Sequence, residues 1–361
     1  MLELSIREKI GQMLMFGVNS NNIDCICELI REYGIGGVIL YRDNYSSYKE
    51  MLLVIKKLKE SNKYNKIPLF IAIDQEGGRV NRMPLEVNNI KSIWDLSKLN
   101  DLNVLNSGAD IISEMLIKSG INMNFSPVLD IYNDTENKVL YKRCFSNNID
   151  VVSEYGINYM NIFKKNGIIS VVKHFPGHGA SNGDSHFLWP YIHNYKSVLN
   201  KHIIPFEKAI NSGCDAIMVG HLIIRKLTGI YPASLSKSFV KNYLRDMCNY
   251  DGVVITDDVR MGLFGKLFGN SLIKKFFETG IDIAVVKYKT GDDKVINNIV
   301  DMVDNGDISI HVINKSVDRI IRLKKKYKIN DDVNFNGFDI NSINRKIEKI
   351  NKLVKWFLNG V

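Results

Sequence analysis

The sequence predicts a single (β/α)8 barrel of the TIM type. Two observations carry this prediction: eight short apolar runs recur along the chain, and segments with helical spacing separate them. Alternating strand and helix units build parallel sheets, and eight such units favour a closed barrel over an open, doubly wound sheet. No GxGxxG or GxxxxGK[ST] motif follows the early runs, which disfavours a dinucleotide or nucleoside triphosphate site.

The eight apolar runs have the character of strands that are buried on both faces. They are rich in Val, Ile and Leu and show no polar alternation, as expected in a parallel sheet covered by helices. In chain order the predicted strands are 12–18, 36–40, 68–74, 121–130, 168–174, 215–221, 252–258 and 282–287.

Helical spacing is clearest at 101–120 and 148–167, each of which stops at a glycine, as helices commonly do. Beyond residue 330 a further apolar stripe follows the helical period, so we expect 1–330 to form the barrel and 331–361 a helical C-terminal extension packed on it. The alternative is that this apolar stripe binds a partner. Its apolar residues are Phe338, Ile340, Ile343, Ile347, Ile350, Val354 and Phe357.

Composition indicates a globular protein without unusual partners. Of 361 residues 45% are hydrophobic and 24% charged, and no apolar stretch approaches the roughly 18 residues of a membrane span. The first residues lack a small-residue cleavage site, so we expect a cytoplasmic protein with no membrane partner. Five cysteines without a CxxC pair suit free thiols rather than disulfides or structural zinc. The net charge of +9 comes from scattered lysines, so no nucleic acid partner is expected.

Polar residues stand at the carboxyl ends of six predicted strands, where barrel enzymes carry their catalytic side chains. An acid at such a position is often only a helix N-cap, so any one of them has a structural interpretation. Their joint placement at one end of the barrel indicates a site. They are Asp74, Asp130, His174, His221, Asp257, Asp258 and Lys287.

The stretch "VVKHFPGHGASNGDSHF" at 171–187 holds three of the seven histidines and follows the fifth strand into a glycine-rich loop. "KHFPGHG" with "DSH", "DQEGGRVNR" at 74–82, "KRCFS" at 142–146, "PASLS" at 232–236 and "VVITDDVRMG" at 253–262 resemble the β-N-acetylhexosaminidase branch of glycoside hydrolase family 3. The resemblance runs to about residue 330. It implies a barrel that removes terminal β-linked N-acetylglucosamine, with peptidoglycan fragments as the usual substrate of cytoplasmic members.

The resemblance also implies the catalytic groups of a retaining glycosidase, which needs a nucleophile and a proton donor. Asp257, directly after Thr256, matches the nucleophile, and His186 matches the histidine that this branch uses in place of a second carboxylate. Asp184, two residues earlier, can orient the His186 ring and stabilise its protonated form. Strand alternation turns Asp258 away from Asp257, which makes Asp258 a cap or a supporting acceptor.

Five further positions match the family's sugar contacts: Asp74 and Arg82 for hydroxyls, then Arg143, Lys173 and His174. A carboxylate accepts from two hydroxyls and an arginine donates in a rigid fork. The chain departs from the family at Cys144, where Ser is usual, and a thiol donates only weakly.

Three other interpretations use the same residues. A metal hydrolase would draw on His174, His178, Asp184 and His186, but these lie on one loop without a common zinc spacing, so we expect no metal and no cofactor. A phosphorylase is a closer alternative, because a histidine acid/base carries no negative charge that would repel an incoming phosphate. A sugar-binding barrel without turnover is the alternative outside enzymes. For His178 the better interpretation is a histidine that packs inside the loop. The sequence does not determine the preferred leaving group or the oligomeric state.

Overall fold

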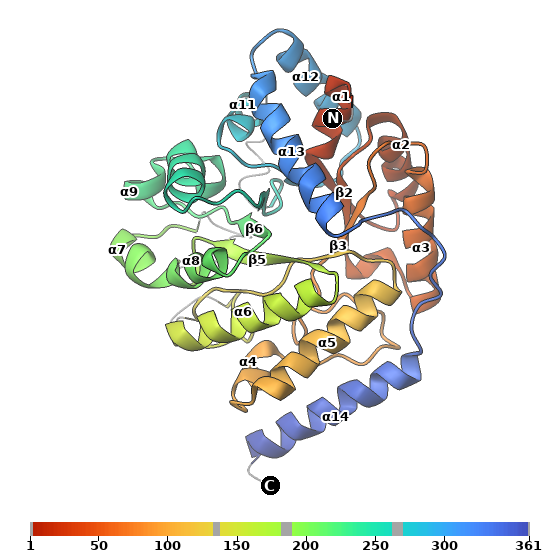
Figure 1. Ribbon diagram of the computed structural model, residues 1–361, viewed down its shortest axis with the longest axis vertical. Coiled ribbons are helices and arrows are strands. Elements are labelled where there is room, and N and C mark those ends of the chain that lie inside the picture. Colours follow the sequence, from red (N-terminus) through yellow and green to blue (C-terminus); the bar gives the residue numbers. More distant parts are fainter. Residues whose placement is uncertain (1–2, 133–137, 182–189, 262–269, 360–361) are drawn as a thin grey trace.

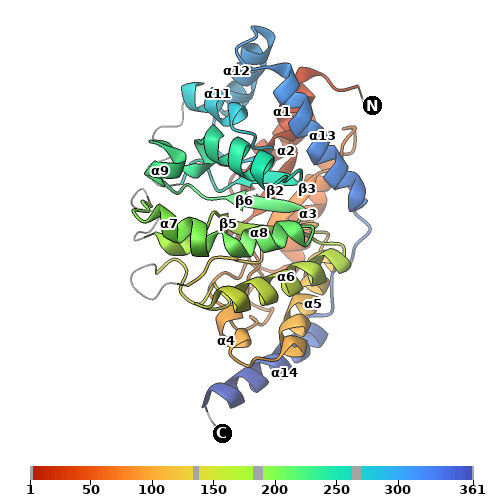
Figure 2. The same cartoon turned by 60° about the vertical axis from the view of Figure 1, so that its left-hand side comes forward.

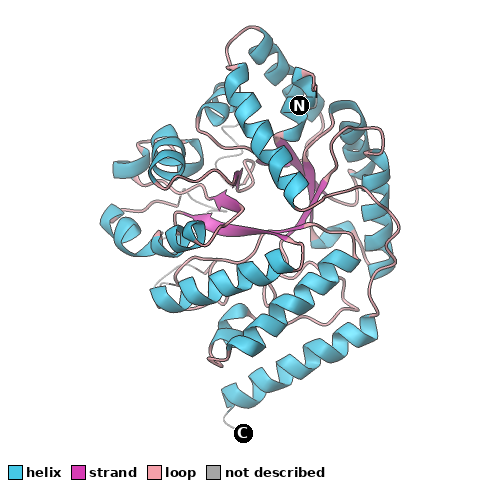
Figure 3. Cartoon of the chain, viewed as in Figure 1, coloured by secondary structure: helices cyan, strands magenta, loops and turns pink. Residues whose placement is uncertain are grey.

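The computed structural model describes residues 3–132, 138–181, 190–261 and 270–359. Eight parallel strands form a nearly closed barrel with helices around it (Figures 1 and 3), so the predicted fold is confirmed. Each strand overlaps one predicted apolar run. The strands are β1 Leu14–Val18, β2 Gly37–Leu40, β3 Phe70–Ile73, β4 Met123–Asn124, β5 Ile169–Phe175, β6 Ala216–Val219, β7 Val253–Thr256 and β8 Ala284–Lys287.

The order of neighbouring strands is β7-β6-β5-β4-β3-β2-β1-β8. β7 and β8 meet through a single parallel bridge between Ile255 and Ile283 rather than a full ladder. The Thr256 N–H donates to the Ile283 carbonyl at 3.0 Å, and Val259 donates to Val285 at the same distance. The barrel therefore closes here through a few backbone hydrogen bonds.

β4 is much shorter than the predicted run at 121–130. Pro127 has no N–H to give to a ladder, so regular pairing stops although the apolar pattern continues. Beyond it the chain still follows β5, because the Leu129 N–H donates to the Lys173 carbonyl at 2.7 Å. The Asn124 side chain meanwhile bonds the backbone N–H and carbonyl of Gln75, both at 3.0 Å. β4 and the residues that follow it are thus hydrogen-bonded to the ends of both β3 and β5.

Both helices predicted most clearly are confirmed, at 102–118 and 149–165, with Asp101 and Asn148 as side-chain N-caps. Gly120 and Gly167 follow their last turns with φ of 78° and 81°, which glycine adopts without strain. The helices are α1 Ile6–Gln12, α2 Ile23–Tyr33, α3 Tyr48–Ser61, α4 Ile93–Ser97, α5 Leu102–Lys118, α6 Ile149–Lys165, α7 Tyr195–Ser197, α8 Ile204–Asn211, α9 Arg225–Thr228, α11 Asn270–Glu278, α12 Asp292–Asp304, α13 Ile310–Lys326 and α14 Ile340–Asn359. No helix in these described ranges has the length and apolarity needed to cross a bilayer.

α14 lies along the outer edge of the molecule beside α5 (Figure 2). Ile343, Ile347, Ile350 and Val354 form its buried face, as the helical spacing predicts. Phe357 continues the spacing but is 48% exposed, because it lies on the final turn of the helix.

Lys324 of α13 closes the N-terminal end of the barrel. Its buried amine lies 2.8 Å from Gln12 Oε1 and from the Gly36 carbonyl, and 2.6 Å from the Pro68 carbonyl. These acceptors precede β1, β2 and β3. One side chain is therefore hydrogen-bonded to the residues that precede three neighbouring strands.

We expect Lys324→Met to lower the free energy of unfolding by about 3 kcal/mol, because Gln12 Oε1 and the Pro68 carbonyl lose the amine as a donor, while the Gly36 carbonyl still accepts from the Phe70 N–H. Urea denaturation measures the loss. The matched control is Lys325→Met at the exposed neighbouring position, which should change stability little. Equal effects of the two substitutions would contradict a specific role for the Lys324 amine.

Candidate active site

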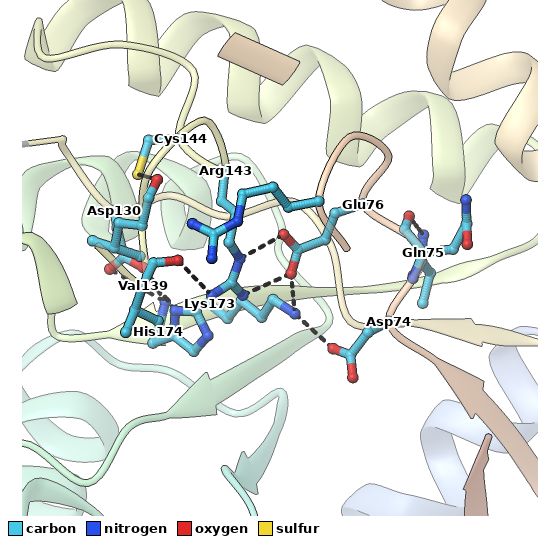
Figure 4. A network of polar contacts seen from close by, with 12 residues as sticks. Asp74, Gln75, Glu76, Asp130, Val139, Arg143, Cys144, Lys173 and His174 are labelled. Atoms are coloured by element: carbon cyan, nitrogen blue, oxygen red, sulfur yellow. Dashed lines mark hydrogen bonds and ion pairs between the residues drawn. The ribbon is translucent and has the colours of Figure 1, made fainter. Parts of the chain in front are cut away.

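Three of the predicted contact residues, Asp74, Arg143 and Lys173, meet in one network at the carboxyl ends of the strands (Figure 4). Asp74 follows β3, Lys173 lies on β5, and Arg143 comes from the segment before α6. Arg82 approaches Asp74, with 3.9 Å between its Nη2 and the Asp74 Oδ2. The barrel thus brings together residues that are far apart in the sequence.

Lys173 is the centre of this network. Its side chain is only 2% exposed, and its amine lies 2.7 Å from Asp74 Oδ1 and 2.6 Å from Glu76 Oε1. A buried cation is tolerated only when it is paired and hydrogen-bonded. The two carboxylates therefore hold this amine in one position.

Glu76 was not among the predicted site residues. It accepts from Arg143 through both oxygens, at 2.9 Å from Nε and 2.8 Å from Nη2. Burial raises the pKa of Glu76, but the charges of Arg143 and Lys173 outweigh it and hold the pKa well below the ordinary value. The carboxylate stays ionised and positions both cations. Its place two residues after Asp74 was the only sequence signal.

Asp74 and Arg82 are the more open members of the site, with side chains 16% and 28% exposed. The Arg82 Nε is buried and has no hydrogen-bond partner among the described residues. A carboxylate and a guanidinium that still have hydrogen-bonding capacity can accept from and donate to the hydroxyls of a bound sugar.

His174 is oriented by Asp130, which is fully buried. Asp130 Oδ2 lies 2.7 Å from His174 Nδ1, and Asp130 Oδ1 accepts from the His178 N–H at 2.6 Å. Burial raises the pKa of Asp130, but the two histidines lower it below the ordinary value. Asp130 was identified from the sequence as an acid at a strand end, but His174 was not identified as its hydrogen-bond partner.

His178 packs inside the loop, with Nδ1 3.1 Å from Ser181 Oγ, and burial lowers its pKa to about 4.

The adjacent acids after β7 lie in different environments. Burial raises the pKa of Asp257, but nearby His174 and His221, the Asp258 N–H and Lys173 hold it below its ordinary value. Asp258 Oδ1 accepts from the N–H groups of Arg260 at 2.9 Å and Lys287 at 3.1 Å. Burial raises the pKa of Asp258. Asp257 therefore keeps an ionised carboxylate, while Asp258 ties β7 to the end of β8.

Cys144, the departure from the family pattern, does not release Arg143. The thiol is buried and lies 3.8 Å from the Leu140 carbonyl, while Glu76 holds the guanidinium through two hydrogen bonds. Arg143 is thus positioned without a hydroxyl at residue 144.

Asp184 and His186, the predicted acid/base pair, lie outside the described residues, so their roles stay predictions. Over the ranges that the structure describes, no three His, Cys, Asp or Glu side chains gather as a metal site would require.

Comparison with known proteins gives a family match and similar relatives. The model of the glycosyl hydrolase family 3 N terminal domain matches residues 5–323. Beta-hexosaminidase A of Pseudoalteromonas piscicida is 29% identical over 330 residues, covering 83% of this chain and 55% of that protein. Beta-hexosaminidase LpqI of Mycobacterium tuberculosis is 28% identical over 330 residues, covering 89% and 83%. The chain thus spans about half of the first relative and most of the second.

A solved structure extends the similarity over nearly the whole chain. The glycoside hydrolase family 3 beta-N-acetylglucosaminidase from Paenibacillus sp. str. FPU-7 superposes with a TM-score of 0.89 and 30% sequence identity. The superposition covers 97% of this chain and 69% of that one.

We expect Glu76→Gln to lower the free energy of unfolding by about 3 kcal/mol at pH 7, because two buried cations lose their shared carboxylate. The folded-state pKa of Glu76 is depressed, so its contribution is present above the unfolded pKa of about 4.3 and is lost as pH falls below it. Urea denaturation at several pH values should give a flatter acid limb for the variant.

The matched control is Glu60→Gln, at an exposed position. A Glu76 variant whose stability follows the wild-type curve at every pH would show that the carboxylate does not hold the two cations in solution.

Proposed function

The chain belongs to glycosyl hydrolase family 3, and we propose that it is an exo-acting β-N-acetylglucosaminidase. Its substrates are terminal β-linked N-acetylglucosamine units on peptidoglycan fragments. The beta-hexosaminidases and the beta-N-acetylglucosaminidase among its relatives support this activity. The substrate source follows from the motif resemblance of the loop at 171–187.

The observation that carries the proposal is the network around Lys173. Asp74 and Arg82 lie beside one another and are both partly open, with side chains 16% and 28% exposed. Lys173 and Arg143 are held in place by Glu76. This arrangement offers one acceptor and several fixed donors to a ligand rich in hydroxyls, with little rearrangement on binding.

The direct test compares hydrolysis of a chromogenic β-N-acetylglucosaminide with that of the matching β-glucoside, each with and without phosphate. We expect the acetamido substrate to be preferred and phosphate to leave the rate unchanged. A rate that rises with phosphate and yields a sugar 1-phosphate would identify the phosphorylase instead. Binding without turnover would identify a sugar-binding barrel.

We propose a retaining mechanism in which Asp257 attacks the anomeric carbon and forms a covalent glycosyl-enzyme. The depressed pKa of Asp257 supports this role, because a nucleophile must be ionised. His186 would protonate the leaving oxygen and then take a proton from water, with Asp184 orienting its ring. Asp258 bonds backbone N–H groups, which disfavours the substrate-assisted route with two neighbouring acids in one pocket.

A slow 2-acetamido-5-fluoro sugar should label the peptide that contains Asp257, because the fluorine slows breakdown of the covalent intermediate. Mass spectrometry locates the adduct. Asp257→Ala should abolish turnover, whereas Asp258→Ala should mainly lower stability. No adduct, combined with strong inhibition by a thiazoline mimic, would instead support attack by the acetamido oxygen.

His186→Ala should slow substrates with poor leaving groups far more than aryl glycosides with good ones, because only a poor leaving oxygen needs a proton. We expect a difference of about 100-fold between the two substrate types. Steady-state rates on a chitobiose-type and a dinitrophenyl substrate measure it. Equal losses on both would remove His186 from the acid role.

We further propose that the protein works in the cytoplasm. All five cysteines are free, and three of them, Cys27, Cys144 and Cys214, are buried. Reduced thiols of this kind persist in a reducing compartment. Immunodetection in fractionated cells tests the location, and recovery from a membrane or extracellular fraction would contradict it.

A further inference from the structure

Two asparagines of α14, Asn344 and Asn351, bond the backbone of the segment 86–91. They stand two turns apart and so face the same side of the helix. Asn344 accepts from the Asn88 N–H at 2.7 Å and donates to the Glu86 carbonyl at 3.0 Å. Asn351 likewise accepts from the Lys91 N–H at 2.9 Å and donates to the Asn89 carbonyl at 2.9 Å. We call these two side chains the asparagine clamp.

The clamped segment in turn supports the Gly77–Gly78 turn. The Gly78 N–H donates to the Ile90 carbonyl at 2.9 Å, and Asn89 Nδ2 donates to the Gly78 carbonyl at 2.6 Å. Gly77 has φ of 86°, and a Cβ placed there would lie 2.6 Å from the Ile90 Cγ2. The turn therefore rests directly on the segment, with no room for a side chain between them.

The turn belongs to the loop that carries the sugar-facing groups. The N–H groups of Glu76 and Gly77 both donate to the Val80 carbonyl, at 3.0 and 3.1 Å. Glu76 then contacts Lys173 and Arg143. Hydrogen bonds therefore connect α14 to the network around Lys173 through a chain of direct contacts.

The clamp is not needed to attach α14 to the barrel, because the buried face of the helix already packs against α5. Asparagine is also a poor residue for a helix interior. Each of the two satisfies one backbone donor and one backbone acceptor of the segment 86–91. They therefore select the position of that segment rather than add apolar contact.

We propose that α14, which lies beyond the residues matched by the family model, is a brace for the substrate-binding loop, and that Asn344 and Asn351 are its positioning residues. They hold the segment 86–91, which holds the turn, and so keep Asp74, Glu76 and Arg82 in the arrangement that binds the sugar. The effect on catalysis rests on the proposed function. The effect on the loop does not.

The test is the double variant Asn344→Ala/Asn351→Ala, with Asn341→Ala as the matched control. Asn341 lies on the same helix, is exposed, and its side chain makes no hydrogen bond within the described residues. We expect KM for a chromogenic β-N-acetylglucosaminide to rise about tenfold in the double variant, with kcat changed by less than about threefold. The control should keep the wild-type KM.

Hydrogen–deuterium exchange supplies a readout that needs no substrate. The N–H groups of Asn88, Lys91 and Gly78 should exchange faster in the double variant, while those at the centre of α14 keep their protection. Wild-type exchange at these N–H groups, or a wild-type KM with faster exchange, would overturn the brace.

If the double variant also loses protection in α14, the single variant Asn351→Asp decides. It keeps an acceptor for the Lys91 N–H but places a carboxylate oxygen against the Asn89 carbonyl, so the loop should loosen while the helix stays docked. Unchanged exchange in its loop would overturn the proposal. A wild-type protein inactive on every β-N-acetylglucosaminide would overturn the proposed function alone.

Discussion

The amine of Lys173 between Asp74 and Glu76 is the interaction on which the rest of the site depends. A cation that is 2% exposed has lost nearly all of its water, and its two carboxylate contacts compensate for that loss. Because both carboxylates come from the loop after β3 and the lysine comes from β5, this contact ties together two strands that are not neighbours. Arg143 neutralises the second acid and brings a third segment to the same place. Asp74 and Arg143 are therefore held in position by this balance of charges.

The strand between β3 and β5 makes that contact possible. β4 pairs regularly over only two residues, and the Asn124 side chain then bonds the backbone of Gln75, beside Asp74. After Pro127 the chain returns to β5 and bonds the Lys173 backbone from both sides, through the Pro127 carbonyl and the Leu129 N–H. The ends of β3 and β5 are therefore each held by backbone contacts before their side chains meet.

The fold was readable from the sequence because buried parallel strands leave an unbroken apolar run, and the strand-end acids follow from those runs. Glu76 was missed because Arg143, its partner, lies 67 residues away, and a glutamate between a polar residue and two glycines looks like any loop acid. The length of β4 was overestimated because the apolar run continues past Pro127, whereas regular strand pairing gives way there to an isolated bridge to β5. Asn344 and Asn351 carry no signal, since asparagine on the polar side of a helix usually faces water. For Glu76, Asn344 and Asn351 the missing information was a long-range partner, which neither local pattern nor periodicity contains.

Asp257 and Asp258 show how such partners decide chemistry. The two residues are identical and adjacent, yet the pKa of Asp257 is lowered and that of Asp258 is raised, although burial raises both. The difference lies in what surrounds each carboxylate: histidine rings and a lysine near Asp257, and for Asp258 two backbone N–H groups that only partly offset its burial and the nearby charge of Asp257. The Asp258 Oδ1 already accepts from the N–H groups of Arg260 and Lys287, so Asp257 is the carboxylate of the pair that we propose to act on a ligand. In the mechanism that we propose, a single attacking carboxylate requires a proton donor from elsewhere, and a histidine on the loop would meet that requirement.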